Sequence, residues 1–182
     1  NAKVAGLVRG GGQGVDGTAA SDAGDLITIN TTGTVGGVQG NLGDAQMWVL
    51  NGAVQGNVEG NEGHDTIVLN GPNARVLGAI DGGTGNDVIA LFQGQVPRVL
   101  GGAGDDEASW DAGKVKVERI DLGTGSDRLT VTNGAGGLGN TVLDGGGVAS
   151  SADGWIDKLT LNGVAHRLNE NQLVNWEIIN LY

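Results

Sequence analysis

The chain has 182 residues, of which 37 are Gly, 2 are Pro and none is Cys, and aromatic residues amount to 3%. This Gly content without a period of three excludes collagen, and the scarcity of aromatic side chains favours a thin repetitive fold over a globule. The formal net charge of -11 repels nucleic acid and anionic lipid, so we expect neither nucleic-acid binding nor membrane insertion by this fragment.

A short alternating segment recurs seven times along the chain. The copies are DLITIN (25–30), QMWVLN (46–51), DTIVLN (65–70), DVIALF (87–92), DEASWD (106–111), DRLTVT (127–132) and DKLTLN (157–162). Their starts at 25, 46, 65, 87, 106, 127 and 157 lie 21, 19, 22, 19, 21 and 30 residues apart. The repeat is therefore close to twenty residues, with one longer coil near the end.

Within the copies, the second and fourth positions after the acidic residue are apolar, as in Ile67 and Leu69. Such alternation predicts a strand with one buried face. By this alignment Gln46 occupies the acidic position of the second copy, and Trp48 and Trp110 fall at inward positions. We therefore expect both Trp side chains in the core.

A weaker apolar run follows several copies, for example NARVLGAIDG (73–82), and a Gly-rich turn precedes the next copy. Strands joined by such short turns cannot be parallel neighbours in a flat sheet. Stacking each strand on its equivalent one coil later resolves this conflict. The sequence thus predicts an all-β, right-handed parallel β-helix over residues 1–162, with residues 163–182 as an irregular last coil or cap of the same domain. Only a brief segment near Asn169 to Leu173 has helical character.

The repeated D-x-I-x-L-N-G and G-x-V-x-G patterns, with the closing LVNWEIINLY (173–182), resemble autotransporter passenger domains of the parallel β-helix adhesin type. The resemblance implies a non-catalytic stalk, exported through the outer membrane and displayed on the bacterial surface or secreted. The expected function is adhesion or aggregation, with a host-cell or matrix component as partner, or self-association. Because the chain starts at Asn1 without a leader, we expect its targeting signals to lie outside it.

A second resemblance concerns the turns. GGTGND (82–87) and GGAGDD (101–106) match the start of the calcium-binding nonapeptide of RTX proteins, and GNEGHD (60–65) and LGTGSD (122–127) are near matches. This resemblance implies calcium turns at Asp65, Asp87, Asp106 and Asp127 in a type I secreted β-roll. Gly and Asp are also the residues that any sharp turn selects. Since only one edge of the coil carries the motif, we expect no required cofactor and favour simple turn formation.

The chain is not expected to be an enzyme. A glycan-processing β-helix enzyme, the remaining alternative, would need paired carboxylates, or calcium with a basic residue, in a groove. Asp105 and Asp106 are sequence neighbours and would point apart. Arg98, Lys114, Lys116 and Arg119 form a basic cluster that ordinary solvated charge explains. We interpret Trp155 and Trp176 as cap residues, with sugar stacking as the alternative.

Overall fold

The structure is a computed structural model, and it describes residues 3–10, 24–147, 154–164, 168 and 170–182. Sixteen strands form one sheet, and every strand pair in it is parallel. The helix in the described residues is a single 3-10 turn, Glu170–Gln172, inside the segment with predicted helical character. Within these ranges, no helix has the length and apolarity that a membrane span requires.

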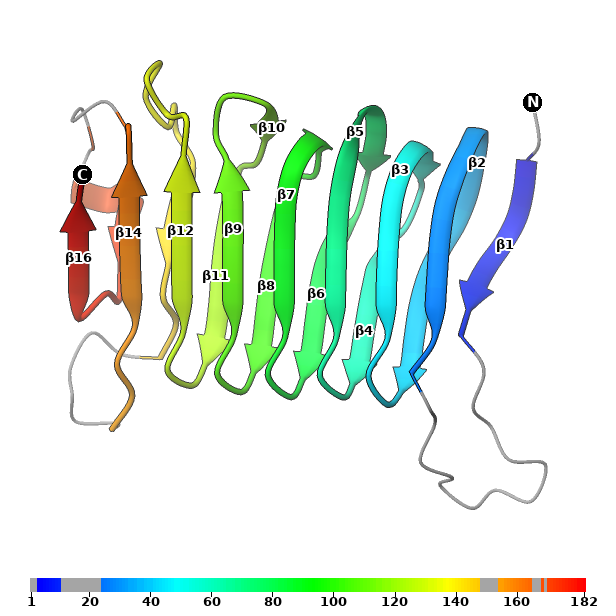
Figure 1. The fold of residues 1–182 in the computed structure, drawn as a ribbon, viewed down its shortest axis with the longest axis horizontal. Helices are drawn as coiled ribbons and strands as arrows, with labels where there is room; N and C mark the ends of the chain where they lie inside the picture. Colours follow the sequence, from blue (N-terminus) through cyan, green and yellow to red (C-terminus); the bar gives the residue numbers. More distant parts are fainter. Residues whose placement is uncertain (1–2, 11–23, 148–153, 165–167, 169) are drawn as a thin grey trace.

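The strands form two stacks, which run along the rod on opposite sides of the core (Figure 1). The first stack contains β2 (Leu26–Leu42), β3 (Gln46–Val54), β5 (Thr66–Val76), β7 (Val88–Gln95), β9 (Glu107–Asp111), β12 (Arg128–Thr132), β14 (Lys158–Asn162) and β16 (Ile178–Leu181). The second contains β1 (Lys3–Arg9), the later part of β2, β4 (Val58–Glu62), β6 (Ala79–Thr84), β8 (Arg98–Ala103), β11 (Arg119–Thr124), β13 (Val142–Asp144) and β15 (Leu173–Val174). The short β10 (Val115–Lys116) pairs with the end of β7.

Each coil is one pass through both stacks, and equivalent residues lie 19 to 22 positions apart. The exception is the coil from Asp127 to Asp157, which is 30 residues long. These spacings arise because each strand donates its hydrogen bonds to the equivalent strand one coil away rather than to its sequence neighbour. The predicted all-β parallel β-helix with coils of about twenty residues is confirmed.

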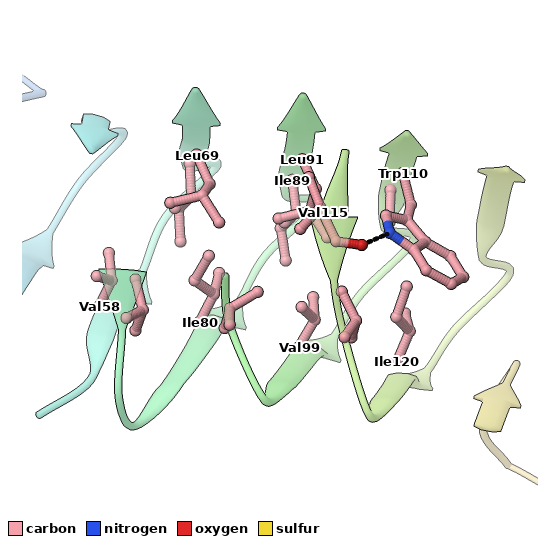
Figure 2. Packing of buried hydrophobic residues seen from close by; sticks show 14 of the residues in the cluster. Val58, Leu69, Ile80, Ile89, Leu91, Val99, Trp110, Val115 and Ile120 are labelled. Carbon is pink, nitrogen blue, oxygen red and sulfur yellow. Dashed lines mark hydrogen bonds between the residues drawn. The ribbon is translucent and has the colours of Figure 1, made fainter. Parts of the chain in front are cut away.

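Alternation along the first stack places the predicted apolar positions inside. Ile67, Leu69, Leu91 and Leu129 are at most 1% exposed, and they face a second row that includes Val58, Ile80, Val99 and Ile120 (Figure 2). Trp110 also lies in this core, as predicted, and its indole N–H donates to the Val115 carbonyl at 3.0 Å. A continuous column of buried aliphatic side chains is the main source of cohesion in such a rod.

The predicted alignment of the second coil is wrong by one residue. Leu26 pairs with Gln46, and Gln46 pairs with Thr66, so Ala45 rather than Gln46 occupies the Asp position. Met47 and Val49 are consequently the inward residues, each 0% exposed. Trp48 points outward and is partly exposed, because a shift of one residue moves a strand side chain to the opposite face.

The tail contributes an eighth strand to the first stack, in addition to the strands of the seven repeat copies. In β16, Ile179 pairs with Leu159 and Leu181 pairs with Leu161. Both residues extend the register of the inward column, although they are 45% and 55% exposed. β15 likewise pairs with β13 in the second stack. The segment was missed because its first position is Glu177 instead of Asp.

Candidate functional site

The structure brings all four predicted turn aspartates into one column at the edge where the second stack turns back into the first. Their side chains are at most 2% exposed. Each Oδ1 accepts the backbone N–H of the equivalent residue one coil earlier, at 2.7 to 2.8 Å. Asp157 adds a fifth rung and Glu177 a sixth. We call the column Asp65, Asp87, Asp106, Asp127 and Asp157 the aspartate ladder.

The second carboxylate oxygen of these residues has a different environment. Oδ2 is buried without a hydrogen-bond partner in Asp65, Asp87, Asp106 and Asp127, as it is in Asp25. In three coils this oxygen packs against an inward Gly of the second stack, where an added Cβ would overlap it; the three are Gly60, Gly82 and Gly101. In these three coils, the Gly that lies five residues before the Asp therefore makes room for its carboxylate.

Burial raises the pKa values of Asp65, Asp87, Asp106 and Asp127 in the ladder. Desolvation is the largest cause in each, and it raises the pKa to about 6 in Asp65, about 7 in Asp87, about 6 in Asp106 and about 8 in Asp127. Neighbouring carboxylates add to the rise, as Asp106 and Asp157 do for Asp127. The backbone N–H bond acts in the opposite direction but is the smaller influence. These four carboxyls therefore exchange their protons between about pH 6 and pH 8.

A second ladder runs beside the first at exposed positions. The N–H groups of His64, Asn86, Asp105 and Ser126 each donate to the side chain one coil earlier, at 2.7 to 2.9 Å. The acceptors are, in order, Asp44, His64, Asn86 and Asp105. The two ladders run in opposite directions, because the buried one accepts from the preceding coil and the exposed one from the following coil. Side-chain acceptors of this kind are what sharp turns need.

The turns offer few free oxygens to a calcium ion. Oδ1 of each ladder residue already accepts an N–H, and the turn carbonyls of Thr84, Ala103 and Thr124 accept N–H groups from the adjacent coil. Calcium takes roughly six to eight oxygen ligands. Among the described residues, no group of three or more His, Cys, Asp or Glu is arranged to hold a metal ion. Simple turn formation at the four aspartates stays the prediction, with calcium binding as its alternative.

The outward side of the first stack differs between the two halves of the rod. Over β2, β3, β5 and β7 it carries large apolar side chains, and three of them are strongly exposed: Leu26 at 73%, Val88 at 43% and Phe92 at 49%. We define the apolar face as Leu26, Trp48, Leu50, Val68, Val88, Ala90 and Phe92. Val68 and Ala90 are only 4% and 8% exposed, so the accessible part of this face is Leu26, Trp48, Leu50, Val88 and Phe92. We define the polar face, over β9, β12 and β14, as Glu107, Ser109, Arg128, Thr130, Lys158 and Thr160.

Trp48 is the side chain that distinguishes the apolar face most clearly. The indole N–H groups of Trp110 and Trp176 donate to the carbonyls of Val115 and Leu143 at 3.0 and 2.9 Å. Trp48 has no such acceptor among the described residues. A partly exposed indole with a free N–H is available to a binding partner.

The predicted basic cluster contains structural ion pairs. The Arg119 guanidinium contacts Asp121 at 3.0 Å and also Asp144, and the Lys114 ammonium contacts Asp111 at 3.1 Å. Lys116 and Glu118 line an open hollow beside Trp110, with a volume of about 380 Å³. Asp105 and Asp106 belong to different ladders, so they do not form a carboxylate pair. The absence of enzyme activity stays a prediction.

Comparisons with models of known protein families, with curated protein sequences and with solved structures give no match to this chain.

Proposed function

We propose that this chain is a non-catalytic segment of a bacterial surface-displayed or secreted protein, and that it presents one outward face of a β-solenoid for adhesion or aggregation. The apolar face is the observation that carries the proposal. A solenoid needs apolar side chains only on its inward side, yet four successive coils place them outward as well. The exposed members of this face lie on β2, β3 and β7, and clusters of exposed apolar side chains mark interaction sites on soluble proteins.

The autotransporter resemblance supports the cellular part of this proposal, namely export through the outer membrane and contact with a host-cell or matrix component. An RTX-like segment of a type I secreted protein is the second candidate, and the stacked turns of the aspartate ladder favour it. The two candidates share the extended rod. They differ in whether calcium stabilises that rod.

The proposal can be tested with beads coated with the purified chain. We expect coated beads to adhere to cultured epithelial cells or to matrix-coated wells, or to aggregate, more than beads coated with albumin. The double variant Leu26→Ser with Phe92→Ser should abolish this difference, whereas Thr130→Ser with Thr160→Ser on the polar face should preserve it. Coated beads that neither adhere nor aggregate would refute the proposal. Equal losses in both variants would remove the apolar face as its basis.

A further inference from the structure

A polar hollow continues the apolar face around the corner of the same coils. Its walls are the side chains of Thr32, Thr34, Asn51 and Asn73 and the backbone of two glycines, and its volume is about 380 Å³. Asn51 follows Leu50 directly in the chain, so the hollow begins where the apolar face ends. Trp48 and Asn51 belong to the same strand, β3, so the hydroxyl and amide groups of the hollow lie further along the strand that carries this indole.

The polar groups of the hollow are not used by the fold. Among the described residues, the side-chain amides of Asn51 and Asn73 and the hydroxyls of Thr32 and Thr34 have no hydrogen-bond partner. In contrast, the Thr31 hydroxyl accepts the Gly33 N–H at 3.0 Å within the turn itself. Amides that both donate and accept, and hydroxyls that can rotate, are suited to a ligand rich in hydroxyl groups.

Charge narrows the class of ligand. The outward first-stack positions of the four coils carry no Asp, Glu, Lys or Arg, although the whole chain has a net charge of -11. The walls of the hollow are also uncharged, and the first charged side chain beyond it is Arg75, which pairs with Ala53. Recognition of an ionic ligand would use the opposite charge at the contact. The site is therefore matched to a neutral ligand.

The size of the face argues against a second copy of the chain as occupant. Four strands at a spacing of ~4.8 Å and about six residues at ~3.3 Å each give a face of roughly 300 Å². A stable protein–protein interface needs about 800 Å² from each partner. A narrow ligand that lies along the sheet and reaches into the hollow fits the available area better.

We propose that the first four coils bind a neutral carbohydrate chain. This inference rests on the proposed function and names the partner class of the same face. The apolar side of a sugar ring stacks on Trp48, whose indole N–H donates to a ring or hydroxyl oxygen. Neighbouring sugar hydroxyls bind the amides of Asn51 and Asn73 in the hollow. Phe92, two coils beyond Trp48, offers a second platform on the order of 10 Å away.

The test measures binding of defined oligosaccharides by isothermal calorimetry and by saturation-transfer NMR. The probes are cellohexaose and maltohexaose as neutral chains and oligogalacturonate as an anionic chain of similar length. We expect a neutral chain to bind at micromolar to millimolar concentration and the anionic chain not to bind. Trp48→Ala should lower the affinity for the neutral chain about tenfold or more, as expected for an aromatic anchor at the centre of a contact. Trp48→Phe should retain part of the affinity that Trp48→Ala loses.

Thr130→Ala is the matched control, because Thr130 lies in the same outward column as Trp48 but on the polar face. Far-ultraviolet circular dichroism checks that each variant folds, and the double variant Asn51→Ala with Asn73→Ala tests the hollow if Trp48→Ala does not fold. Three results overturn the inference: no binding of either neutral chain, preference for the anionic chain, or equal affinity in Trp48→Ala and the parent. If the coated beads still adhere through the apolar face in that case, the proposed function stands with a different partner.

Discussion

One column of outward residues passes from the apolar face to the polar face without a break in the sheet. It contains Trp48, Val68 and Ala90 in the first half of the rod and Ser109, Thr130 and Thr160 in the second. The inward neighbours in both halves are mainly Ile, Leu and Val, with Trp110 as the aromatic exception, and the aspartate ladder runs through both halves. The interior therefore specifies the coil, and the outward positions are free to specify what the coil contacts.

The first prediction concerns a charge placed in the interior of each half of the rod. Leu69 and Leu129 are 0% and 1% exposed, so Leu69→Asp and Leu129→Asp each bury a carboxylate without a partner. We expect each to lower the free energy of unfolding by about 4 kcal/mol or more. Urea unfolding followed by circular dichroism measures the loss.

The controls for these two variants are the adjacent outward residues. Asn70 is exposed and Thr130 is partly exposed. Asn70→Asp and Thr130→Asp should therefore each change the free energy of unfolding by less than about 1 kcal/mol. If the inward variants unfold no more easily than the outward ones, the inward and outward assignment is wrong. If only one half is sensitive, the two halves do not share a common interior.

The second prediction uses the ladder that both halves share. Its raised pKa values mean that the folded state binds protons more tightly than the unfolded chain, in which Asp has its ordinary value near 3.8. The stabilisation from these protons is complete below about pH 4 and is lost as pH rises through the folded pKa values of about 6 to 8. The free energy of unfolding should therefore fall steadily from pH 4 to pH 9, and by more than about 1.4 kcal/mol, which is the value of a one-unit pKa shift in a single carboxyl.

Asp127→Asn should flatten this pH dependence, because Asp127 has the largest of these shifts, to about 8, and is 0% exposed. Asp105→Asn, in the exposed ladder, is the matched control and should reduce the slope less, because the Asp105 charge only adds to the pKa rise that burial causes in Asp106 and Asp127. Thermal melts at several pH values measure both. A parent protein that becomes more stable as pH rises over this interval would contradict the prediction.

The sequence predicts the interior better than the outward faces, for a physical reason. Where polar and apolar residues alternate strictly, as in DRLTVT, the inward side is unambiguous, and Leu129 and Val131 are buried as predicted. The run Met47–Trp48–Val49–Leu50 is apolar throughout, so its alternation does not say which side is buried. Ala45 also lacks the Asp that aligns the other coils.

The same logic explains what was found and missed at the candidate sites. The spacing of Asp65, Asp87, Asp106 and Asp127 was enough to predict that these turns stack. Which atoms their carboxylates contact depends on neighbours one coil away, which no local pattern encodes. The apolar face was missed because the one-residue error at Gln46 assigned Trp48 to the core. The outward position of Phe92 could have indicated the face, since Phe92 follows Leu91 at the end of a well-aligned strand.

The third prediction tests the corrected register of the second coil, in which Ala45 lies between Asp25 and Asp65 at the position of the ladder residues. Ala45→Asp should supply an acceptor for the Asp25 N–H, for which the described residues show none. Gly40 leaves space beside this position, as Gly60 does beside Asp65. We expect a gain of about 1 kcal/mol at pH 5, and a smaller gain above pH 7, where an ionised buried carboxyl is costly.

Gln46→Asp is the control, because it puts the same residue at the position that the uncorrected alignment assigns to the ladder. Gln46 is exposed, so this variant should not change the thermal midpoint appreciably. If Gln46→Asp stabilises the rod and Ala45→Asp does not, the sequence alignment was right and the register of the second coil needs revision.

The last prediction expects the smallest effect and concerns calcium at Asp65, Asp87, Asp106 and Asp127. The thermal midpoint in chelator and in millimolar calcium should agree within a few degrees, because the coils are held by the aliphatic core and by N–H bonds to Oδ1, which need no ion. A bound ion would add stability by mass action and raise the midpoint with concentration. A large calcium-dependent rise that disappears in Asp87→Ala and Asp106→Ala would instead show that the turns bind the metal. It would also separate the two candidate families, since the turn motif belongs to the RTX resemblance and the apolar face does not depend on it.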